Sequence, residues 1–364
     1  MKVQDIQTLI ESIAPLQLQE SYDNSGLLVG NSQDEINGVL ITLDVTEEVI
    51  DEAIKMQLNC IVAHHPLVFK AIKKLTGSNE VERCLIKAIK NNIAIYCAHT
   101  NLDNASEGVN RKIANLIGLE NQRILQPKDG MLVNLVTYVP KDYVDVVRAA
   151  ITEAGAGKIG DYEACTFNTQ GEGTFRALEN ANPFVGSFGE LHKEAEVKIE
   201  SIVPKHSVNL VLTALKMAHP YEEPAFDVFA LENTNPYVGS GMVGELPKEE
   251  NVTEFLNRLK SIFKVESLRF TESNKNIVKK VAVCGGSGSF LISQALRVKA
   301  DVFITGDVKY HDFFIPENKM IIADIGHYES EQFTKELFYE TIKEKFPKFA
   351  VHLSMVNTNP IKYL

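Results

Sequence analysis

The alternation of apolar strands with helices is the feature of this sequence that most constrains its fold. In the first part of the chain, near-continuous runs of Val, Ile and Ala are separated by segments with helical periodicity. Strands that are apolar on both sides need cover on both faces, which favours a largely parallel sheet between helices. This part predicts an α/β lobe with strands at 38–44, 60–63 and 93–98 and helices near 4–14, 47–57, 80–91 and 106–116.

The last part of the chain repeats this style. Apolar runs again alternate with helical segments, so we expect a second α/β lobe of similar length, and mixed, mainly parallel sheets in both lobes. Its predicted strands are 267–271, 279–284, 301–305, 320–324 and 349–353, and its predicted helices are 252–263, 289–297 and 328–345.

Between the lobes the pattern changes to an α+β order. The segments are LVNLVTYVP, a helix near 142–154, EACTFN, GTFRA, AEVKIESIVP, a helix near 207–217 and FDVFAL. They give β-α-β-β-α-β, which is the ferredoxin-like order. Polar turns mark both ends of this insert. The predicted domains are therefore lobe 1 at 1–126, an inserted ferredoxin-like domain at 127–234 and lobe 2 at 235–364.

Composition and charge exclude several classes of protein. The 364 residues are 45% hydrophobic, which excludes disordered and collagen-like chains. The 37 Lys and Arg against 48 Asp and Glu give a net charge of −11, which disfavours nucleic acid as a partner. Five cysteines without a C-x-x-C pair indicate free thiols in a reducing compartment. No stretch approaches the roughly 20 apolar residues of a membrane span, so we expect a cytoplasmic protein with no membrane partner.

His64-His65-Pro66 is the strongest local signal for chemistry. The pair directly follows the predicted strand at 60–63, and the strand must end before Pro66. Both imidazoles can therefore turn toward one site, where they would act as metal ligands. Taken by itself, the pair is equally consistent with two ordinary loop histidines.

Carboxylates and a third histidine follow other strands. Asp103 comes after the strand at 93–98, and ligand sites of open α/β sheets lie outside such strand ends. Alone, Asp103 would be a helix cap. His327 and Glu331 follow the strand at 320–324 and are four residues apart, so they share one face of a helix. Alone, Glu331 could be a solvated helix residue.

Together these five residues offer more ligands than one tetrahedral ion needs. Imidazole with carboxylate suits Zn²⁺, Mn²⁺ or Fe²⁺, and five such ligands suffice for two divalent ions bridged by carboxylate and water. Two such ions with two carboxylates leave a local charge of about +2, which attracts small anionic or phosphorylated substrates despite the acidic surface.

Six segments, in this order, resemble the Nif-three-like dinuclear metal-centre family, whose members are commonly labelled GTP cyclohydrolase 1 type 2 homologues. They are Tyr22–Gly30, His64-His65-Pro66, His99–Asp103, Cys284–Ser289, Thr305-Gly306-Asp307 and Gly326-His327-x3-Glu331. By that resemblance the metal ligands are His64, His65, Asp103, His327 and Glu331. The family often has Trp where this chain has Tyr22.

The insert also resembles a known module. Gly173–Arg176, Asn182–Gly186 and His219–Pro224 are similar to the extra domain of longer family members, which is related in fold to CutA-type and PII-like trimeric proteins. The resemblance implies a homo-oligomer, a toroidal homohexamer whose inserts form trimeric caps.

Two functions remain open from sequence. The first is a metal-dependent hydrolase that acts through a metal-bridging water, with GTP ring opening as the candidate that the family label gives. The second is a metal-binding regulatory or metal-handling hexamer in which the insert senses a small molecule.

Proton transfer and secondary sites have weaker candidates. His99, Glu107 and Asp307 are possible acid or base residues, and His311 is a possible pocket residue. The turn Gly285–Ser289 could present backbone N–H groups to a phosphate, although it lacks the Lys of a P-loop and suits a plain tight turn equally. His219 could be a regulatory metal ligand or a turn histidine.

Overall fold

A computed structural model describes residues 1–364, and the chain forms two compact units. One unit consists of residues 1–127 and 236–364, and the other is the insert, residues 128–235. The predicted insert, 127–234, differs from this by one residue at each end. Both predicted lobes belong to the first unit.

The first sheet has the strand order β1-β4-β3-β2-β15. The four strands from β4 to β15 are parallel, and β1 runs antiparallel to β4. Every residue of β2, β3 and β4 is buried, which explains their uninterrupted apolar sequences. The strands are β1 (Gly26–Val29), β2 (Val39–Thr42), β3 (Cys60–Ala63), β4 (Ala94–Cys97) and β15 (Val351–Leu353).

Helices with one apolar face cover this sheet. Thr46 and Asn79 cap two of them by accepting backbone N–H groups of Val49 and Glu82 at 3.3 and 3.0 Å. The helices are α1 (Val3–Ile13), α2 (Glu47–Lys55), α3 (Glu80–Lys90) and α11 (Thr334–Lys345).

The C-terminal strand lies in a different sheet from the one predicted. Sequence placed 349–353 in the second lobe, but β15 pairs with β2 of the first sheet, Val351 opposite Val39. The reason is the packing of α11, which contacts both α1 and β2 and so delivers the chain to the free edge of β2.

The second sheet has the order β11-β14-β13-β12-β10-β5. Its centre, β12 to β14, is parallel, and the strands outside it are antiparallel to their neighbours. The prediction of a mainly parallel sheet is therefore wrong for this lobe, because β10, β5 and β11 add antiparallel pairings at both edges. The strands are β5 (Glu120–Pro127), β10 (Gly239–Asn251), β11 (Arg269–Phe270), β12 (Ile277–Ser287), β13 (Val302–Gly306) and β14 (Ile321–Asp324).

Helices from both halves of the chain pack on the second sheet. The helix α5 (Val109–Ile117), which precedes the insert in sequence, lies against β10 and β12, as does α8 (Val252–Phe263). The other helices are α9 (Ile292–Arg297) and the short α10 (His327–Glu331). The single helix predicted at 328–345 is thus two helices, α10 and α11.

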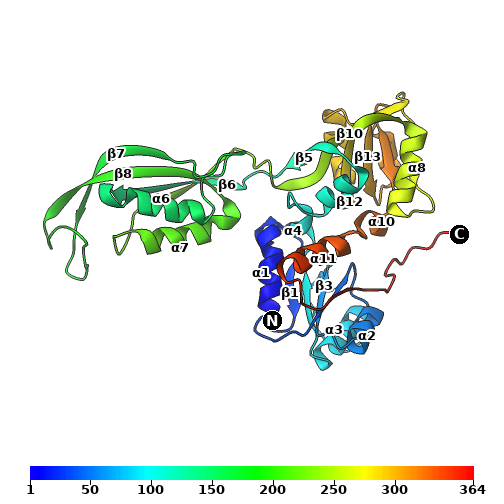
Figure 1. The fold of residues 1–364 in the computed structure, drawn as a ribbon, viewed down its shortest axis with the longest axis horizontal. Coiled ribbons are helices and arrows are strands. Elements are labelled where there is room, and N and C mark those ends of the chain that lie inside the picture. Colours follow the sequence, from blue (N-terminus) through cyan, green and yellow to red (C-terminus); the bar gives the residue numbers. More distant parts are fainter. The chain divides into compact units, whose positions relative to one another are not determined.

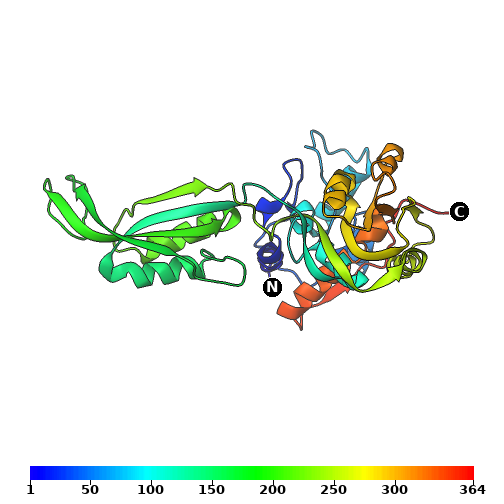
Figure 2. The same cartoon turned by 90° about the horizontal axis from the view of Figure 1, so that it is seen from above.

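The insert is a four-stranded antiparallel sheet in the order β7-β8-β6-β9, with the predicted β-α-β-β-α-β succession. Its helices lie together on one face of the sheet (Figures 1 and 2). The end of EACTFN, Phe167 and Asn168, and most of GTFRA, Gly173–Arg176, belong to one strand, β7, whereas residues 163–166 precede it. The elements are β6 (Leu132–Pro140), α6 (Val144–Glu153), β7 (Phe167–Arg176), β8 (Leu191–Pro204), α7 (Val208–Ala218) and β9 (Phe226–Ala230).

Two further expectations concern the whole chain. All five cysteines are free, as their sparse spacing predicted. None of the helices combines the length and the apolar character that crossing a bilayer requires.

Candidate metal centre

Five predicted ligands meet where strands of both sheets end. His64 and His65 directly follow β3, and Asp103 ends α4 (Thr100–Asp103), the short helix after β4. His327 and Glu331 are the first and last residues of α10, which follows β14. Ligand atoms of these residues lie within 4.8 Å of one another in two overlapping groups of three, both containing Glu331, and His99 forms a further such group with His64 and His65. The carboxyl ends of parallel strands therefore build one cluster from distant parts of the sequence.

One ring nitrogen of His64 faces this cluster without a hydrogen-bond partner. Its ring is fully buried, and Nδ1 lies 2.9 Å from the carbonyl oxygen of Ala98. A carbonyl only accepts, so Nδ1 carries the proton. Burial lowers the pKa of His64, which keeps the ring neutral. Nε2 therefore holds a lone pair and has no hydrogen-bond partner, with Asp103 Oδ1 at 3.6 Å and Glu331 Oε1 at 3.7 Å.

His65 and His327 are oriented in the same way, by carboxylates. Nδ1 of His65 donates to Asp44 Oδ1 at 2.7 Å, and Nδ1 of His327 donates to Asp307 Oδ2 at 2.6 Å. The two Nε2 atoms are 3.3 Å apart, and both face Glu331 Oε2, at 3.0 and 3.1 Å. Fixing one ring nitrogen of a histidine so that the other points into the site is the usual support of a metal ligand.

The charges around these rings favour protons where a cation would bind. Burial alone would lower the pKa of both histidines, but hydrogen bonds with carboxylates outweigh it. Asp44 and Glu331 raise the pKa of His65 to about 10, and Glu331 and Asp307 raise that of His327 to about 9. Without a metal, protons therefore hold the positions between the imidazoles and Glu331.

Glu331 belongs to both groups and offers a different oxygen to each. Oε2 faces His65 and His327, whereas Oε1 faces His64. Burial would raise the pKa of Glu331, but hydrogen bonds with the three histidines hold it well below its usual range. The pKa of Asp103 is raised well above its usual range by burial and by the nearby charge of Glu331. The buried Asp103 Oδ1 has no hydrogen-bond partner. A divalent cation would satisfy both this oxygen and His64 Nε2.

The glycine turn after β12 makes room for Glu331. A Cβ at Gly286 would lie 2.3 Å from Glu331 Oε1, and the residue has φ +61°. The backbone N–H groups of Gly285, Gly286 and Gly288 already donate to Asn110, Ser330 and Thr305 at 2.9 Å each. Three backbone donors of 285–289 are therefore occupied, which favours the plain tight turn over a phosphate cradle.

His99 stands beside the cluster with a buried carboxylate behind it. Its ring centroid is 5.3 Å from that of His64 and 5.5 Å from that of His65. Nδ1 donates to Asp23 Oδ1 at 2.8 Å, and Asp23 also accepts from Thr100 and Ser25. Burial would raise the pKa of Asp23, but its hydrogen bonds with His99 and Thr100 lower it. Asp23 is thus a fixed negative charge that orients the His99 ring.

The C-terminal segment after β15, residues 354–364, contacts this arrangement from outside. Thr358 Oγ1 donates to Asp44 Oδ2 at 2.6 Å, on the carboxylate that holds His65. Asn359 Nδ2 donates to the buried Glu329 Oε1 at 2.8 Å. Ser354 and its neighbour Met355 bind Glu52.

Not every predicted residue is at the site. Glu107 is largely exposed and lies 3.6 Å from Arg111, so the structure does not support its acid or base role. His311 packs on Tyr310 in an exposed turn and belongs to none of the metal-ligating groups. Asp307 is at the site, but as the carboxylate that orients His327.

Sequence reasoning missed the roles of Asp23 and Asp44. Asp44 closely follows β2, at the end of a parallel strand. The argument that identified Asp103 from its position after a strand could therefore have identified Asp44 as well. Asp23 precedes an edge strand and meets His99 across 76 residues, and only the tertiary structure reveals that contact.

Comparisons with known proteins agree with this architecture over the whole chain. The profile of Duf34/NIF3 (NGG1p interacting factor 3) matches residues 1–360. A Halalkalibacterium halodurans protein named GTP cyclohydrolase 1 type 2 homolog is 40% identical, and the alignment covers all of both chains. A Bacillus subtilis protein of the same name is 38% identical over 99% of this chain and 98% of its own.

Solved structures give the same result. A Bacillus cereus protein related to NIF3 has a TM-score of 0.86 and 37% identity, covering 100% of this chain and 99% of that one. A Staphylococcus aureus protein has a TM-score of 0.77 and 32% identity with the same coverage. With its ligand-like residues gathered at the strand ends and relatives matched from end to end, this chain belongs to the Duf34/NIF3 family.

Proposed function

We propose that the protein is a metal-dependent hydrolase with two divalent ions in each chain. His65, His327 and Glu331 would hold one ion, and His64, Asp103 and Glu331 would hold the other. The observation that supports this most directly is the pair of buried, unpartnered atoms, His64 Nε2 and Asp103 Oδ1. Buried polar atoms without partners are costly, and a shared cation accounts for both.

The donor set indicates the metal class and its chemistry. Imidazole with carboxylate suits Zn²⁺, which we propose, and also Mn²⁺ or Fe²⁺. Such ions would lower the pKa of a water molecule at the site and would polarise the group under attack. The chain's own residues set the positions, because Asp44, Asp307 and the Ala98 carbonyl fix the three rings.

His99 is the residue we propose for proton transfer. Nδ1 is held by Asp23, so Nε2 is the nitrogen free to take or deliver a proton at the site. A carboxylate behind an imidazole fixes the tautomer and the orientation of the ring, as in other acid and base pairs. His99 thus accepts the proton released on attack and returns it to the leaving group.

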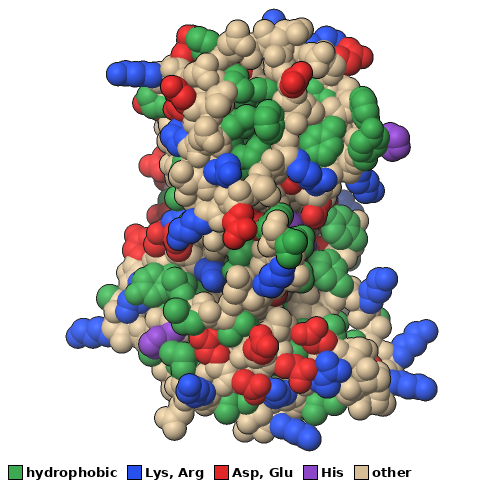
Figure 3. Space-filling view, turned by 90° about the vertical axis from the view of Figure 1, so that its right-hand side faces the viewer, with side chains coloured by type: hydrophobic (Ala, Val, Ile, Leu, Met, Phe, Trp, Pro, Cys, Tyr) green, Lys and Arg blue, Asp and Glu red, His purple; other side chains and the backbone are tan.

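An anionic, phosphorylated small molecule is the proposed substrate class. Acidic and basic side chains are interspersed on the face in Figure 3, so that face presents no continuous basic track for nucleic acid. Two divalent ions with two carboxylates reverse the sign of the field locally. GTP is the specific candidate, because relatives bear the name GTP cyclohydrolase 1 type 2 homolog.

We propose further that the chain works as a toroidal homohexamer in the cytoplasm, with the insert as a CutA/PII-like module. The family resemblance supports the assembly, and five free cysteines support the compartment. Light scattering should give six times the 40.5 kDa mass of one chain. A monomeric mass would contradict the assembly without affecting the metal assignment.

Metal analysis tests the centre directly. Purified wild type should hold two ions per chain, and His64→Ala and Glu331→Ala should each hold less, with Glu331→Ala losing more because it serves both groups. Glu107→Ala is the matched control, since that carboxylate is exposed and outside the site. Unchanged stoichiometry in Glu331→Ala would refute the ligand assignment.

The hydrolase is tested with metal-loaded protein and GTP. Opening of the purine ring at C8 releases formate, which is measured directly, and His99→Ala should lower the rate while the metal content stays at the wild-type level. Absence of formate would remove GTP as substrate and leave other phosphorylated compounds to be assayed by the same variants.

A metal-binding regulator is the second candidate, favoured by a cavity of about 840 Å³ within the insert. The two functions predict different behaviour for a chain that lacks 128–235. A hydrolase retains its activity and metal, whereas a regulator loses the response that the insert confers.

A further inference from the structure

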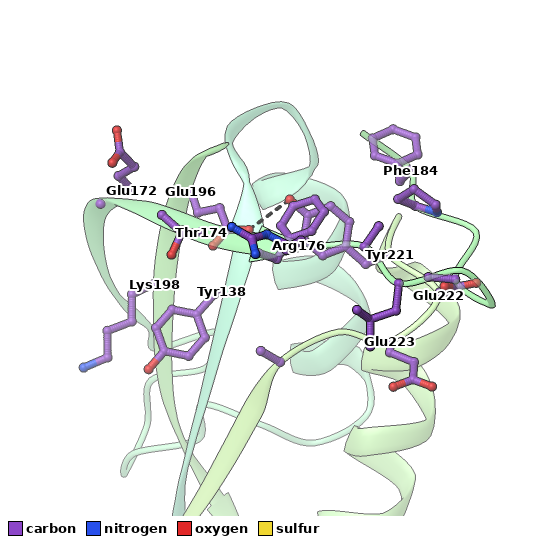
Figure 4. Close-up of a pocket in the computed structure, with 18 of the residues that line it drawn as sticks. Tyr138, Glu172, Thr174, Arg176, Phe184, Glu196, Lys198, Tyr221, Glu222 and Glu223 are labelled. Atoms are coloured by element: carbon purple, nitrogen blue, oxygen red, sulfur yellow. Dashed lines mark hydrogen bonds between the residues drawn. The ribbon is translucent and has the colours of Figure 1, made fainter. Parts of the chain in front are cut away.

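Three sequence segments of the insert that the metal centre does not use meet at one cavity. Gly173–Arg176 lies at the end of β7, Pro183 and Phe184 lie in the loop that follows, and Tyr221–Glu223 follows α7. All of them line the cavity of about 840 Å³, a size typical of small-molecule sites. Figure 4 shows the Tyr221 ring and the Glu196 side chain meeting there, with Glu222 and Glu223 on the facing segment.

Aromatic rings form much of the wall. The ring centroid of Tyr221 is 6.0 Å from that of Phe175 and 6.3 Å from that of Phe184. Phe184 is half exposed, so its ring is open to a ligand. The negative faces of such rings attract ammonium and guanidinium groups.

A carboxylate is held at a fixed place among these rings. Glu196, on β8, accepts a hydrogen bond from the Tyr221 hydroxyl at 2.9 Å. On the neighbouring strand, a Cβ at Gly173 would lie 2.1 Å from Glu196 Oε2. The glycine therefore leaves room for this oxygen, and a side chain there would displace it.

The charges of the cavity do not cancel. Glu172 pairs with Lys193 at 2.8 Å, and Lys198 pairs with Glu200 at 3.1 Å, so these lining residues are neutralised. The remaining charged residues of the lining are Arg176, Glu196, Glu222 and Glu223, none of which forms an ion pair. Three carboxylates against one guanidinium leave a net charge of −2, which favours a cationic ligand.

A metal ion does not suit this cavity. His219, the nearby histidine, accepts from the Tyr221 backbone N–H at Nδ1 (3.1 Å) and donates from Nε2 to the Tyr138 carbonyl (2.9 Å). Both of its nitrogens are occupied, so the interpretation of His219 as a metal ligand is wrong. No metal-ligating group of three lies in the insert.

We propose that this cavity binds an organic cation, a small molecule with ammonium or guanidinium groups on an apolar skeleton. Its charged groups bind Glu196 and the Glu222–Glu223 pair, and its skeleton packs against Tyr221, Phe175 and Phe184. The inference is independent of the proposed hydrolase activity, because all of these residues lie in the insert.

Calorimetric titration of the full-length protein with spermidine tests the proposal. Saturable binding at one site per chain is expected, weakened about 10-fold or more in Glu196→Gln, since a charge-assisted hydrogen bond is lost. Asp145→Asn is the matched control, because that exposed carboxylate of the insert lies on α6 and both it and its partner Arg148 are outside the cavity lining. Its affinity should equal that of the wild type.

Substitution of Arg176 tests whether the cavity prefers a cationic or an anionic ligand. Arg176→Gln removes the single unpaired positive charge, so spermidine should bind more tightly to this variant. An anionic ligand would instead lose affinity, and titration with AMP measures that directly. Glu222→Gln with Glu223→Gln changes only exposed side chains and serves if Glu196→Gln is unstable. Three results would overturn the proposal. They are the absence of saturable spermidine binding, a spermidine affinity that is unchanged in both carboxylate variants, and AMP binding that Arg176→Gln abolishes.

Discussion

Individual side chains in the centre follow one rule. Each imidazole uses Nδ1 for a protein oxygen and turns Nε2 toward Glu331. Histidines at strand ends were visible in the sequence, and so was the spacing of His327 and Glu331. The oxygens that orient the rings were not, because hydrogen bonds such as His65 to Asp44 link separate strand ends and depend on the packed sheet.

The raised pKa values of His65 and His327 predict how stability depends on pH in the metal-free protein. A histidine whose pKa is higher in the folded state than its ordinary value of about 6.5 stabilises the fold fully below that pH. The contribution declines as pH rises and is lost through about 9 for His327 and about 10 for His65. Urea denaturation in chelator should show stability falling between pH 6.5 and 8.5, more steeply than in His65→Asn. Equal slopes would contradict the assignment.

Thr358 is predicted to tune metal binding through Asp44. Thr358→Val removes the 2.6 Å hydrogen bond to Asp44 Oδ2 and loosens the carboxylate that orients His65. Metal affinity should fall about 10-fold, at the lower end of the 10- to 100-fold range for such supporting residues. Thr358→Ser keeps the hydroxyl and should retain wild-type affinity in competition with a chromophoric chelator. Equal affinities for the two variants would show that the contact is incidental.

Strands and turns show where sequence patterns succeed and fail. Fully buried strands such as β2 and β3 were predicted from their apolar runs. The long strand β10 was not, because Gly239, Gly241, Gly244 and Pro247 give it the composition of a turn. The break between α10 and α11 has no Gly or Pro, and it coincides with Gln332, whose side chain donates to the Phe263 carbonyl. Tertiary contacts decided both cases.

The turn after β12 yields a matched pair of glycine variants. Gly286→Ala places a Cβ 2.3 Å from Glu331 Oε1, so it should displace the carboxylate and reduce metal content at both positions. Gly118→Ala meets nothing within 4 Å but has φ +80°, so it carries the backbone strain alone, about 1 kcal/mol. Thermal melts should show a loss in both variants, and metal analysis a loss only in Gly286→Ala. Full metal content in Gly286→Ala would show that Glu331 can shift without cost.

At the scale of the whole molecule, the chain segments just before and just after the insert remain adjacent in the first unit. Gly239 pairs with Pro127 on adjacent strands, so the chain leaves and re-enters the first unit at nearby points. The composition change at 127–234 made the insert visible in the sequence. The pairing of β15 with the first sheet could not be predicted from the sequence. The residue pattern of a parallel strand does not indicate which strand it pairs with.

Removal of the insert is therefore predicted to preserve the metal centre. A chain in which a short Gly-rich turn joins Pro127 to Pro236 should fold and keep the wild-type metal content, since no metal-ligating group lies in 128–235. The same chain should lose spermidine binding. Metal analysis and titration on one preparation give both results, and loss of metal in a folded chain would show that the insert supports the centre.

The dependence of both ligand groups on Glu331 has a consequence for how the protein is made. During synthesis His64, His65 and Asp103 leave the ribosome first, then the insert, and Glu331 follows only near the end. A nascent or prematurely terminated chain lacks a carboxylate common to both groups, and it also lacks the later Thr358. Under the proposed ligand assignment, a chain that ends before Glu331 retains only the group of His64, His65 and His99, so binding of both proposed ions is tied to completion of the polypeptide.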